Sequence, residues 1–315
     1  MTVTETGMPV VTPKVDLGPD REIGEEIYNG DFLKVLNDAI SSVGLTCWVL
    51  FDRLDEAFAS RQDVEVPALR ALMRCYLDLN TFENIRLKLF LRKDLFRKIT
   101  EGGFVNLTHI NARRIDIVWD EEDLIDLIVR RVTQRNELKE LLSDPENNES
   151  VFAVLLPSQI DVGDRKPSTR NWIMSRIRDG NNNRPPRNII DLLNKARDSQ
   201  IRREQRDERD IDAKIGPFIE TDAVKRAITQ LSEQRVQDTL LAEASELSEI
   251  IQSFRDGKSE HSRETISQTI PDAENLDGAI KSLVDIGFLE EFGQNFKIPM
   301  LYRDGLRIKQ GKAFD

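Results

Sequence analysis

The chain has 315 residues, with 45 Lys and Arg against 56 Asp and Glu, and a formal net charge of −11 at pH 7. This length suggests two or three domains, and no apolar run reaches the ~18 residues of a membrane span, so we expect a cytoplasmic protein without membrane contact. With two cysteines and two histidines, the composition argues against a disulfide framework, a Cys/His metal site and His-based catalytic dyads.

The first part of the chain predicts a leader followed by an α/β core. Residues 1–30 have no helical or strand period, and we expect them to be a disordered leader. From Asp31, apolar residues at three and four spacings predict a helix that stops at Gly44. The apolar run 46–51 comes next, and its continuous character is typical of a parallel strand covered on both faces.

The same order is then repeated. Pro67 is expected at the first position of a second helix. Ile85, Leu87, Leu89, Phe90 and Leu91 then predict a second buried strand. Alternating helices and strands predict an α/β fold with a parallel sheet over residues 31–135. Residues 104–110 are expected to add a third strand, and an acid-rich first turn predicts a helix that begins near Asp120.

The rest of the chain predicts a helical segment and a small terminal domain. Residues 136–215 are expected to form a helical lid; within it, residues 165–209 carry 13 basic and 6 acidic side chains, a local charge of about +7. Residues 216–315 begin with a long helix expected over 221–254 and continue with two shorter helices near 260–270 and 274–287. A hairpin across Gly293 then completes the pattern of a winged helix.

The motif that most strongly indicates chemistry follows the first strand. Trp48 to Phe51 is apolar, and Asp52, Asp55 and Glu56 come directly after it. A strand that delivers an Asp at its carboxyl end suits Mg²⁺, which needs only one or two carboxylates beside nucleotide phosphates. A further carboxylate can orient or deprotonate an attacking water. The alternative is a solvated acidic turn after an apolar strand.

Two arginines are candidate phosphate sensors. Arg92 follows the second strand, where its bidentate fork would suit a γ-phosphate. The alternative for Arg92 is an ion pair with Asp94 or Glu56. Arg187 lies near the start of a lid helix, from which it could reach a nucleotide, although the basic segment around it could equally be a solvated helix or a surface for protein or nucleic acid.

Together these motifs resemble those of bacterial STAND/AAA+-like P-loop ATPases, in which a D-x-x-D-E Walker B signature follows four apolar residues. The resemblance covers residues 46–56, 87–96, 104–128, 184–197 and 280–308. It implies that Asp52 is the Mg²⁺ ligand and Glu56, with Asp55, the water-activating acid, while Arg92 is the first sensor and Arg187 the second. ATP and Mg²⁺ would be the cofactors of a regulatory or signalling ATPase.

The chain departs from that family in one respect. The Walker A loop, Gly-x-x-x-x-Gly-Lys-Ser/Thr, is absent: Gly257-Lys258-Ser259 has Gln252 where the first Gly is required. Without the loop there is no backbone nest for phosphates. The chain therefore resembles a truncated, split or degenerate ATPase, and we expect weak or no ATP hydrolysis by this chain alone. A protein that supplies the missing part, or a homo-oligomer, is the expected partner.

Two other classes of function remain open. The first is a non-enzymatic winged-helix module that binds nucleic acid or protein. Its candidate recognition helix, 272–287, carries four acids against Lys281, which suits DNA poorly and favours a protein contact. The second is an interaction scaffold without either activity.

Overall fold

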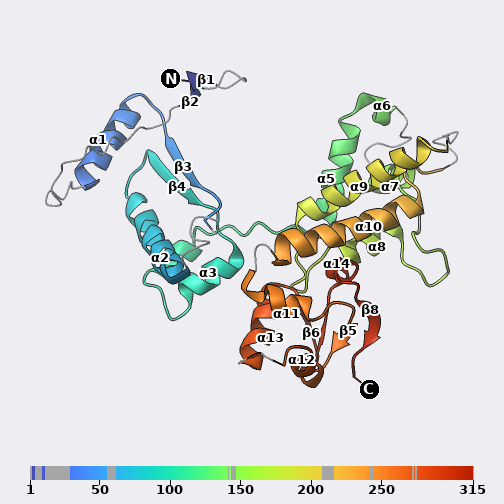
Figure 1. Cartoon of the computed structure of the whole chain (residues 1–315). Coiled ribbons are helices and arrows are strands. Elements are labelled where there is room, and N and C mark those ends of the chain that lie inside the picture. Colours follow the sequence, from blue (N-terminus) through green and yellow to red (C-terminus); the bar gives the residue numbers. More distant parts are fainter. Residues whose placement is uncertain are drawn as a thin grey trace. The chain divides into compact units, whose positions relative to one another are not determined.

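The computed structural model divides the chain into an N-terminal unit, residues 1–114, and a C-terminal unit, residues 115–315 (Figure 1). The structure describes the residues 2–3, 9–10, 29–54, 62–140, 142, 147–207, 216–241, 245–271, 273 and 275–314. The fold is mixed α/β with a small parallel sheet and a second, larger sheet, as the sequence predicted at that level. Among the described residues, no helix has the length and apolar character needed to span a bilayer.

The described part of the N-terminal unit contains a short antiparallel strand pair, a parallel strand pair and four helices. Its elements are β1 (Thr2–Val3), β2 (Pro9–Val10), α1 (Asn29–Ser42), β3 (Cys47–Phe51), α2 (Gln62–Leu79), β4 (Ile85–Leu89), α3 (Lys93–Thr100) and α4 (Leu107–Asn111).

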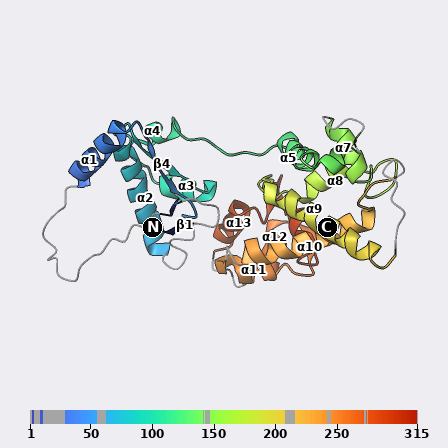
Figure 2. The ribbon, with the colours of Figure 1, turned by 90° about the horizontal axis from the view of Figure 1, so that it is seen from above.

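Strands β3 and β4 form the parallel pair that the sequence predicted. Their register runs from Cys47 opposite Ile85 to Phe51 opposite Leu89. Helix α2 lies against β4 (Figure 2), and Ile85 and Leu87 are buried. Four of the five residues of β3 are exposed, however, so the prediction that this strand is covered on both faces is wrong within the described structure. The described helices supply cover on the β4 side, and β3 is left at the edge of the pair.

Two local predictions in this unit are also wrong. Helix α2 begins at Gln62, so Pro67 lies inside the helix and not at its first position. Residues 104–110 form no strand, because Asn106 adopts a left-handed conformation with φ of 65° and starts the short helix α4. In this helix, Ile110 is buried in the small core that also contains Leu69 and Ile99.

The C-terminal unit is helical in its first half and carries a four-stranded sheet in its second. Its elements are α5 (Glu121–Thr133), α6 (Asn136–Lys139), α7 (Asn148–Leu155), α8 (Thr169–Arg176), α9 (Pro186–Glu204), α10 (Thr221–Arg235), a π-helical turn η1 (Val236–Leu241), a 3-10 turn η2 (Ser245–Leu247), α11 (Ser248–Gln252), β5 (Lys258–His261), α12 (Arg263–Thr269), α13 (Leu276–Asp285), β6 (Glu290–Phe292), β7 (Asn295–Lys297), α14 (Met300–Arg303) and β8 (Lys309–Lys312).

Helix α5 belongs to this unit. It begins as predicted, with Asp120 as its cap: the Asp123 N–H donates to the Asp120 carboxylate at 2.8 Å. Leu124 and Ile128 are buried in the core of the C-terminal unit. The boundary at residue 135, drawn from the sequence, therefore differs from the division seen in the structure, which falls after Arg114.

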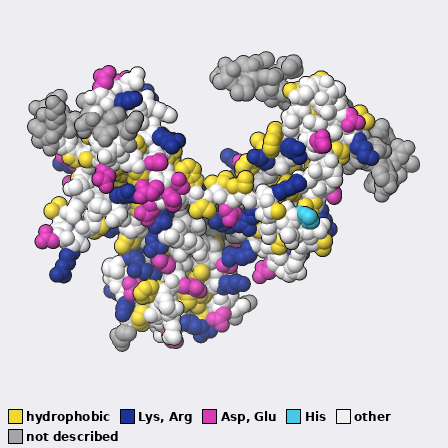
Figure 3. Space-filling model, turned by 180° about the vertical axis from the view of Figure 1, so that it is seen from behind, with side chains coloured by type: hydrophobic (Ala, Val, Ile, Leu, Met, Phe, Trp, Pro, Cys, Tyr) yellow, Lys and Arg dark blue, Asp and Glu magenta, His cyan; other side chains and the backbone are white. Residues whose placement is uncertain are grey.

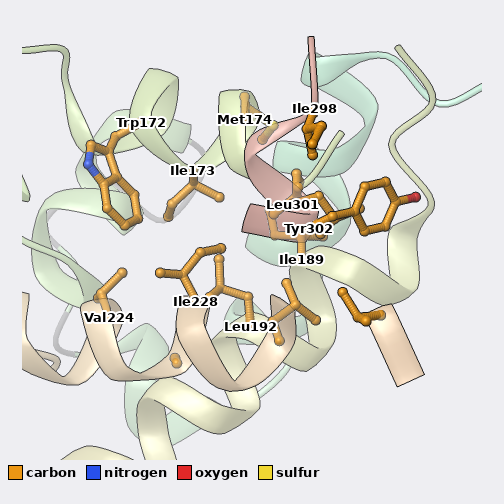
Figure 4. Packing of buried hydrophobic residues seen from close by; sticks show 14 of the residues in the cluster. Trp172, Ile173, Met174, Ile189, Leu192, Val224, Ile228, Ile298, Leu301 and Tyr302 are labelled. Carbon is orange, nitrogen blue, oxygen red and sulfur yellow. The ribbon is translucent and has the colours of Figure 1, made fainter. Parts of the chain in front are cut away.

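One continuous core joins the segments that the sequence assigned to a lid and to a winged helix. Helices α9 and α10 lie alongside each other in both ribbon views (Figures 1 and 2). Figure 4 shows Trp172 and Ile173 of α8 packed above Val224 and Ile228 of α10. Leu301 and other residues of α14 complete the same cluster. Because the described residues of 136–215 and 216–315 share this core, we expect them to unfold together.

The prediction of one long helix over residues 221–254 is wrong. It ends at Arg235 and is followed by the η1 and η2 turns and by α11. A straight helix of that length would extend for about 50 Å and would carry its last apolar residues away from the core. In the broken form, Leu240, Ile251 and Phe254 are all buried in one cluster.

The sheet of the C-terminal unit has the order β6-β7-β5-β8. The β6–β7 hairpin was predicted, with Asn295 as part of the turn; Asn295 instead pairs with Phe292 as the first residue of β7. Strand β5 pairs antiparallel with β7 and parallel with β8. Strands β5 and β8 were not predicted, because Lys258–His261 and Lys309–Lys312 carry no apolar alternation.

Candidate functional site

Asp52 lies immediately beyond the carboxyl end of β3. The Phe90 N–H donates to the Phe51 carbonyl at 2.9 Å, so the two strands are still joined at the residue before Asp52. The Asp52 side chain is exposed, and one of its oxygens accepts the Arg53 N–H at 2.8 Å. Arg53 has φ of 55°, and Leu54 then returns to the core. This turn holds the Asp52 carboxylate outward, with its second oxygen available to a metal ion.

Arg92 is the third residue after β4, which ends at Leu89. It is the N-cap residue of α3, with extended backbone, and its carbonyl accepts the Phe96 N–H at 3.0 Å. Its side chain is exposed. Because parallel strands end at the same edge of a sheet and lie about 4.8 Å apart, Asp52 and Arg92 share one edge of the β3–β4 pair.

The remaining members of the predicted cluster cannot be placed beside this edge. Asp55 and Glu56 lie outside the described residues. Among the residues that are described, no group of three or more His, Cys, Asp or Glu side chains is arranged to hold a metal ion. Of the predicted site residues, the described part of the strand edge therefore contains Asp52 and Arg92.

Arg187 is the second residue of α9, after Pro185 as the N-cap and Pro186 at the first position. Its side chain is exposed and forms no ion pair or hydrogen bond with any described residue. The nearby Arg184 differs, because its guanidinium pairs with Glu121 of α5 at 2.9 Å. Arg187 is therefore the arginine of this loop that is available to a ligand. It belongs to the C-terminal unit, whereas Asp52 and Arg92 belong to the other.

Below Arg187, a buried polar network fixes the start of α9. The Asn188 amide donates to the Ile177 carbonyl at 2.7 Å, and its oxygen accepts from Arg235 Nε at 2.8 Å. Arg235 also pairs with Asp191. Sequence reasoning missed this network, because Asn188 and Arg235 are 47 positions apart and only the packing of α9 on α10 brings them together.

A second polar cluster surrounds Trp172. The indole N–H donates to Asp161 at 2.9 Å, and Asp161 pairs with Lys225 at 2.8 Å. The hydrogen bonds from Lys225 and Trp172 lower the pKa of Asp161 below its ordinary value. The Arg176 guanidinium lies 3.8 Å from the centre of the indole ring. The cluster ties α8 to α10.

Acids pair with part of the basic segment 165–209. Five of its arginines form ion pairs, four of them with acids from elsewhere in the C-terminal unit. The pairs are Arg170–Glu122, Arg178–Glu290, Arg184–Glu121, Arg197–Asp198 and Arg203–Glu220. On the face drawn in Figure 3, Lys and Arg side chains are scattered among acidic and apolar ones. On this face, acidic and apolar side chains therefore interrupt the positive charge, unlike the continuous basic surface that follows a nucleic-acid backbone.

The hairpin and helix α13 present mixed chemistry to solvent. Phe292, at the end of β6, is 66% exposed, and Glu291 beside it is exposed as well. Asp277 at the start of α13 pairs with Arg263 at 2.9 Å. An exposed aromatic ring flanked by acids is better suited to a protein surface than to phosphates.

Comparisons with protein-family models, with curated proteins and with solved structures gave no match to this chain.

Proposed function

We propose that this chain is the Walker-B-to-C-terminal part of a P-loop ATPase-like regulatory protein. It would act with another polypeptide segment that supplies the phosphate-binding loop. The observation that carries the proposal is the pairing of β3 with β4 in parallel, which puts Asp52 and Arg92 at one edge of the sheet. Carboxyl ends of parallel strands are where α/β proteins collect their ligands.

Within this proposal, each residue has a distinct task. Asp52 would hold Mg²⁺ beside the nucleotide phosphates, and Glu56 with Asp55 would orient the attacking water. Arg92 would contact the γ-phosphate, and Arg187 would report on nucleotide from the lid. The exposure of Asp52 and Arg187 supports these roles, since both side chains face solvent. ATP and Mg²⁺ fit the strand edge only in part, because the 315 residues contain no Walker A loop.

Phosphate release from ATP tests whether the chain needs a partner for catalysis. We expect purified 1–315 to hydrolyse ATP no faster than its Glu56→Gln variant, because the phosphates have no backbone nest. Turnover by the wild-type chain that Glu56→Gln abolishes would show that these residues form a complete ATPase and would overturn the need for another segment.

The metal-binding role of Asp52 has its own test. Mn²⁺ replaces Mg²⁺ as a paramagnetic probe, and its binding to 1–315 with millimolar ATP is followed by electron paramagnetic resonance. We expect Asp52→Asn to weaken Mn²⁺·ATP binding by about tenfold, or 1.4 kcal/mol. The matched control is Asp78→Asn, which removes the same charge from the exposed face of α2. Equal binding by the two variants would contradict the role of Asp52.

We further propose that residues 216–315 form a winged-helix module used for protein contact. The order β5, α12, α13, β6, β7 and the pairing of β7 with both β6 and β5 support this arrangement. Exposed Phe292 and the acids around it favour a protein partner over DNA.

Titration of 1–315 with a fluorescent DNA duplex at low salt separates these two uses. We expect no change in anisotropy, because Asp277 and Glu291 oppose the phosphate backbone. Salt-dependent binding that is lost when Arg307 and Lys309 are replaced by Glu would favour the nucleic-acid module instead.

A further inference from the structure

One face of the β3–β4 pair carries exposed side chains, among them Trp48, Leu50 and Lys88. In the observed register, Trp48 lies opposite Arg86 and Leu50 lies opposite Lys88. Side chains alternate between the two faces of a sheet, so these four residues share one face, which we call the outer face. The inner face contains Leu87, which is buried, and Leu89, which packs against the small core.

The outer face combines an apolar row with a basic row. Trp48 and Leu50 are 54% and 61% exposed. Lys88 Nζ lies 4.8 Å from the centre of the Trp48 ring, so the two rows are in contact. Neither Arg86 nor Lys88 forms an ion pair or a hydrogen bond with any described residue. Parallel sheets are normally covered on both faces, and this one exposes apolar side chains together with unpaired positive charge.

The charges on this face decide which occupant fits. A second copy of the chain packed face to face would bring Arg86 and Lys88 against their own copies, and like charges at close range oppose association. A helix that carries acids beside an apolar stripe meets no such repulsion. We propose that the outer face docks an amphipathic, acidic helix of a partner protein, which covers Trp48 and Leu50 and pairs its carboxylates with Arg86 and Lys88.

The dimensions of the two surfaces agree. Residues two apart on a strand are separated by about 6.6 Å, and residues four apart on a helix rise by about 6 Å. Two apolar residues at i and i+4 can therefore meet Trp48 and Leu50, while acids on the neighbouring face of the helix meet the basic row. A helix about 10 Å wide covers both strands, which lie about 4.8 Å apart. This interaction is independent of the nucleotide chemistry proposed above.

A pair of synthetic peptides tests the proposal on the full chain. The first is a fluorescein-labelled helix of about 18 residues, long enough to be helical, with Leu at i and i+4 and Glu on both flanks. The second has Lys in place of every Glu. Fluorescence anisotropy is recorded with 1–315 at increasing salt. We expect the Glu peptide to bind, with affinity that falls as salt is raised, and the Lys peptide not to bind.

Charge reversal on the protein supplies the decisive comparison. The double variant Arg86→Glu/Lys88→Glu is expected to bind the Glu peptide at least about tenfold more weakly and to gain binding of the Lys peptide. The control is Lys98→Glu, an exposed residue of α3, which should change affinity less than about twofold. Trp48→Ser should weaken binding of the Glu peptide without producing binding of the Lys peptide, because it removes the larger side chain of the apolar row and changes no charge.

Three outcomes would overturn the proposal. The first is failure of the Glu peptide to bind the wild-type chain. The second is equal loss of binding in the double variant and in Lys98→Glu, with circular dichroism showing both to be folded. The third is a dimer, seen by analytical ultracentrifugation, that Trp48→Ser dissociates, because a second copy would then occupy this surface.

Discussion

Replacing Asn188 by Ala is expected to destabilise the C-terminal unit strongly. Asn188 is buried and joins two otherwise separate groups, the Ile177 carbonyl and the Arg235 guanidinium. The Ala side chain reaches neither of them. Arg235 keeps its pairing with Asp191, while its Nε and the Ile177 carbonyl lose their partners inside the core.

The size of the effect follows from those two lost bonds. A buried donor or acceptor left without a partner costs about 1–3 kcal/mol, so the two together predict a loss of about 2–6 kcal/mol. Ala favours the helix more than Asn does, by about half a kcal/mol, which offsets a small part. With a urea dependence of about 2 kcal/mol per M, the unfolding midpoint should fall by roughly 1–3 M.

Urea unfolding followed by the fluorescence of Trp172, which is buried in this core, measures the change. A Trp48→Phe background removes the signal of the N-terminal unit. The matched control is Asn194→Ala, the same substitution at an exposed position of α9, which should shift the free energy of unfolding by less than about 0.5 kcal/mol. Equal, small shifts for Asn188→Ala and Asn194→Ala would show that the two hydrogen bonds of Asn188 contribute little to the stability of the unit.

Three further changes in the same unit have defined outcomes. A Cβ on Gly180 would lie 2.5 Å from the Leu289 carbonyl oxygen. Gly180→Ala should therefore lower the free energy of unfolding in urea by about 1–3 kcal/mol. Gly216→Ala is the control and should lower it far less, because a Cβ there meets open space. Burial lowers the pKa of His261 below its ordinary value of 6.5, so the unfolded chain takes up the proton first and stability falls as the pH drops below 6.5. The difference in melting temperature, wild type minus His261→Gln, should therefore decrease from pH 7 to pH 5. A difference that does not change with pH would contradict a lowered pKa for His261. Phe254→Ala removes a fully buried ring from the core and should lower the free energy of unfolding by about 3–5 kcal/mol. A loss below about 1 kcal/mol would contradict the burial of Phe254 in this core.

Local sequence signals predicted the elements whose stability is itself local. Asp120 caps α5 with a hydrogen bond to its own first turn, and the acids that follow marked that start in the sequence. A continuous apolar run identified β3, and the apolar residues Ile85, Leu87 and Leu89 identified β4, because strand residues this close in sequence need no distant partner to be recognised. The positions of Asp52 and Arg92 after those strands followed from the same pattern, and the parallel pairing was predicted correctly.

Elements whose existence depends on distant partners could not be predicted in this way. Strand β8 is a polar segment that becomes a strand because β5 lies beside it. The helix predicted to run through residue 254 breaks after Arg235, because folding back buries Phe254 in a core that a straight helix would miss. Residues 104–110 looked like a strand from their composition, yet no neighbouring strand is paired with them in the described structure.

By itself, the sequence determined the apolar strands, the acid-capped helix and the carboxylate and arginine that follow β3 and β4, since each depends on residues close together in the chain. The tertiary structure alone decided that β3 remains an exposed edge, that Arg184 is held by Glu121 while Arg187 is not, and that Asn188 meets Arg235. Burial and pairing are properties of surfaces brought together by folding, and residue order alone does not specify them.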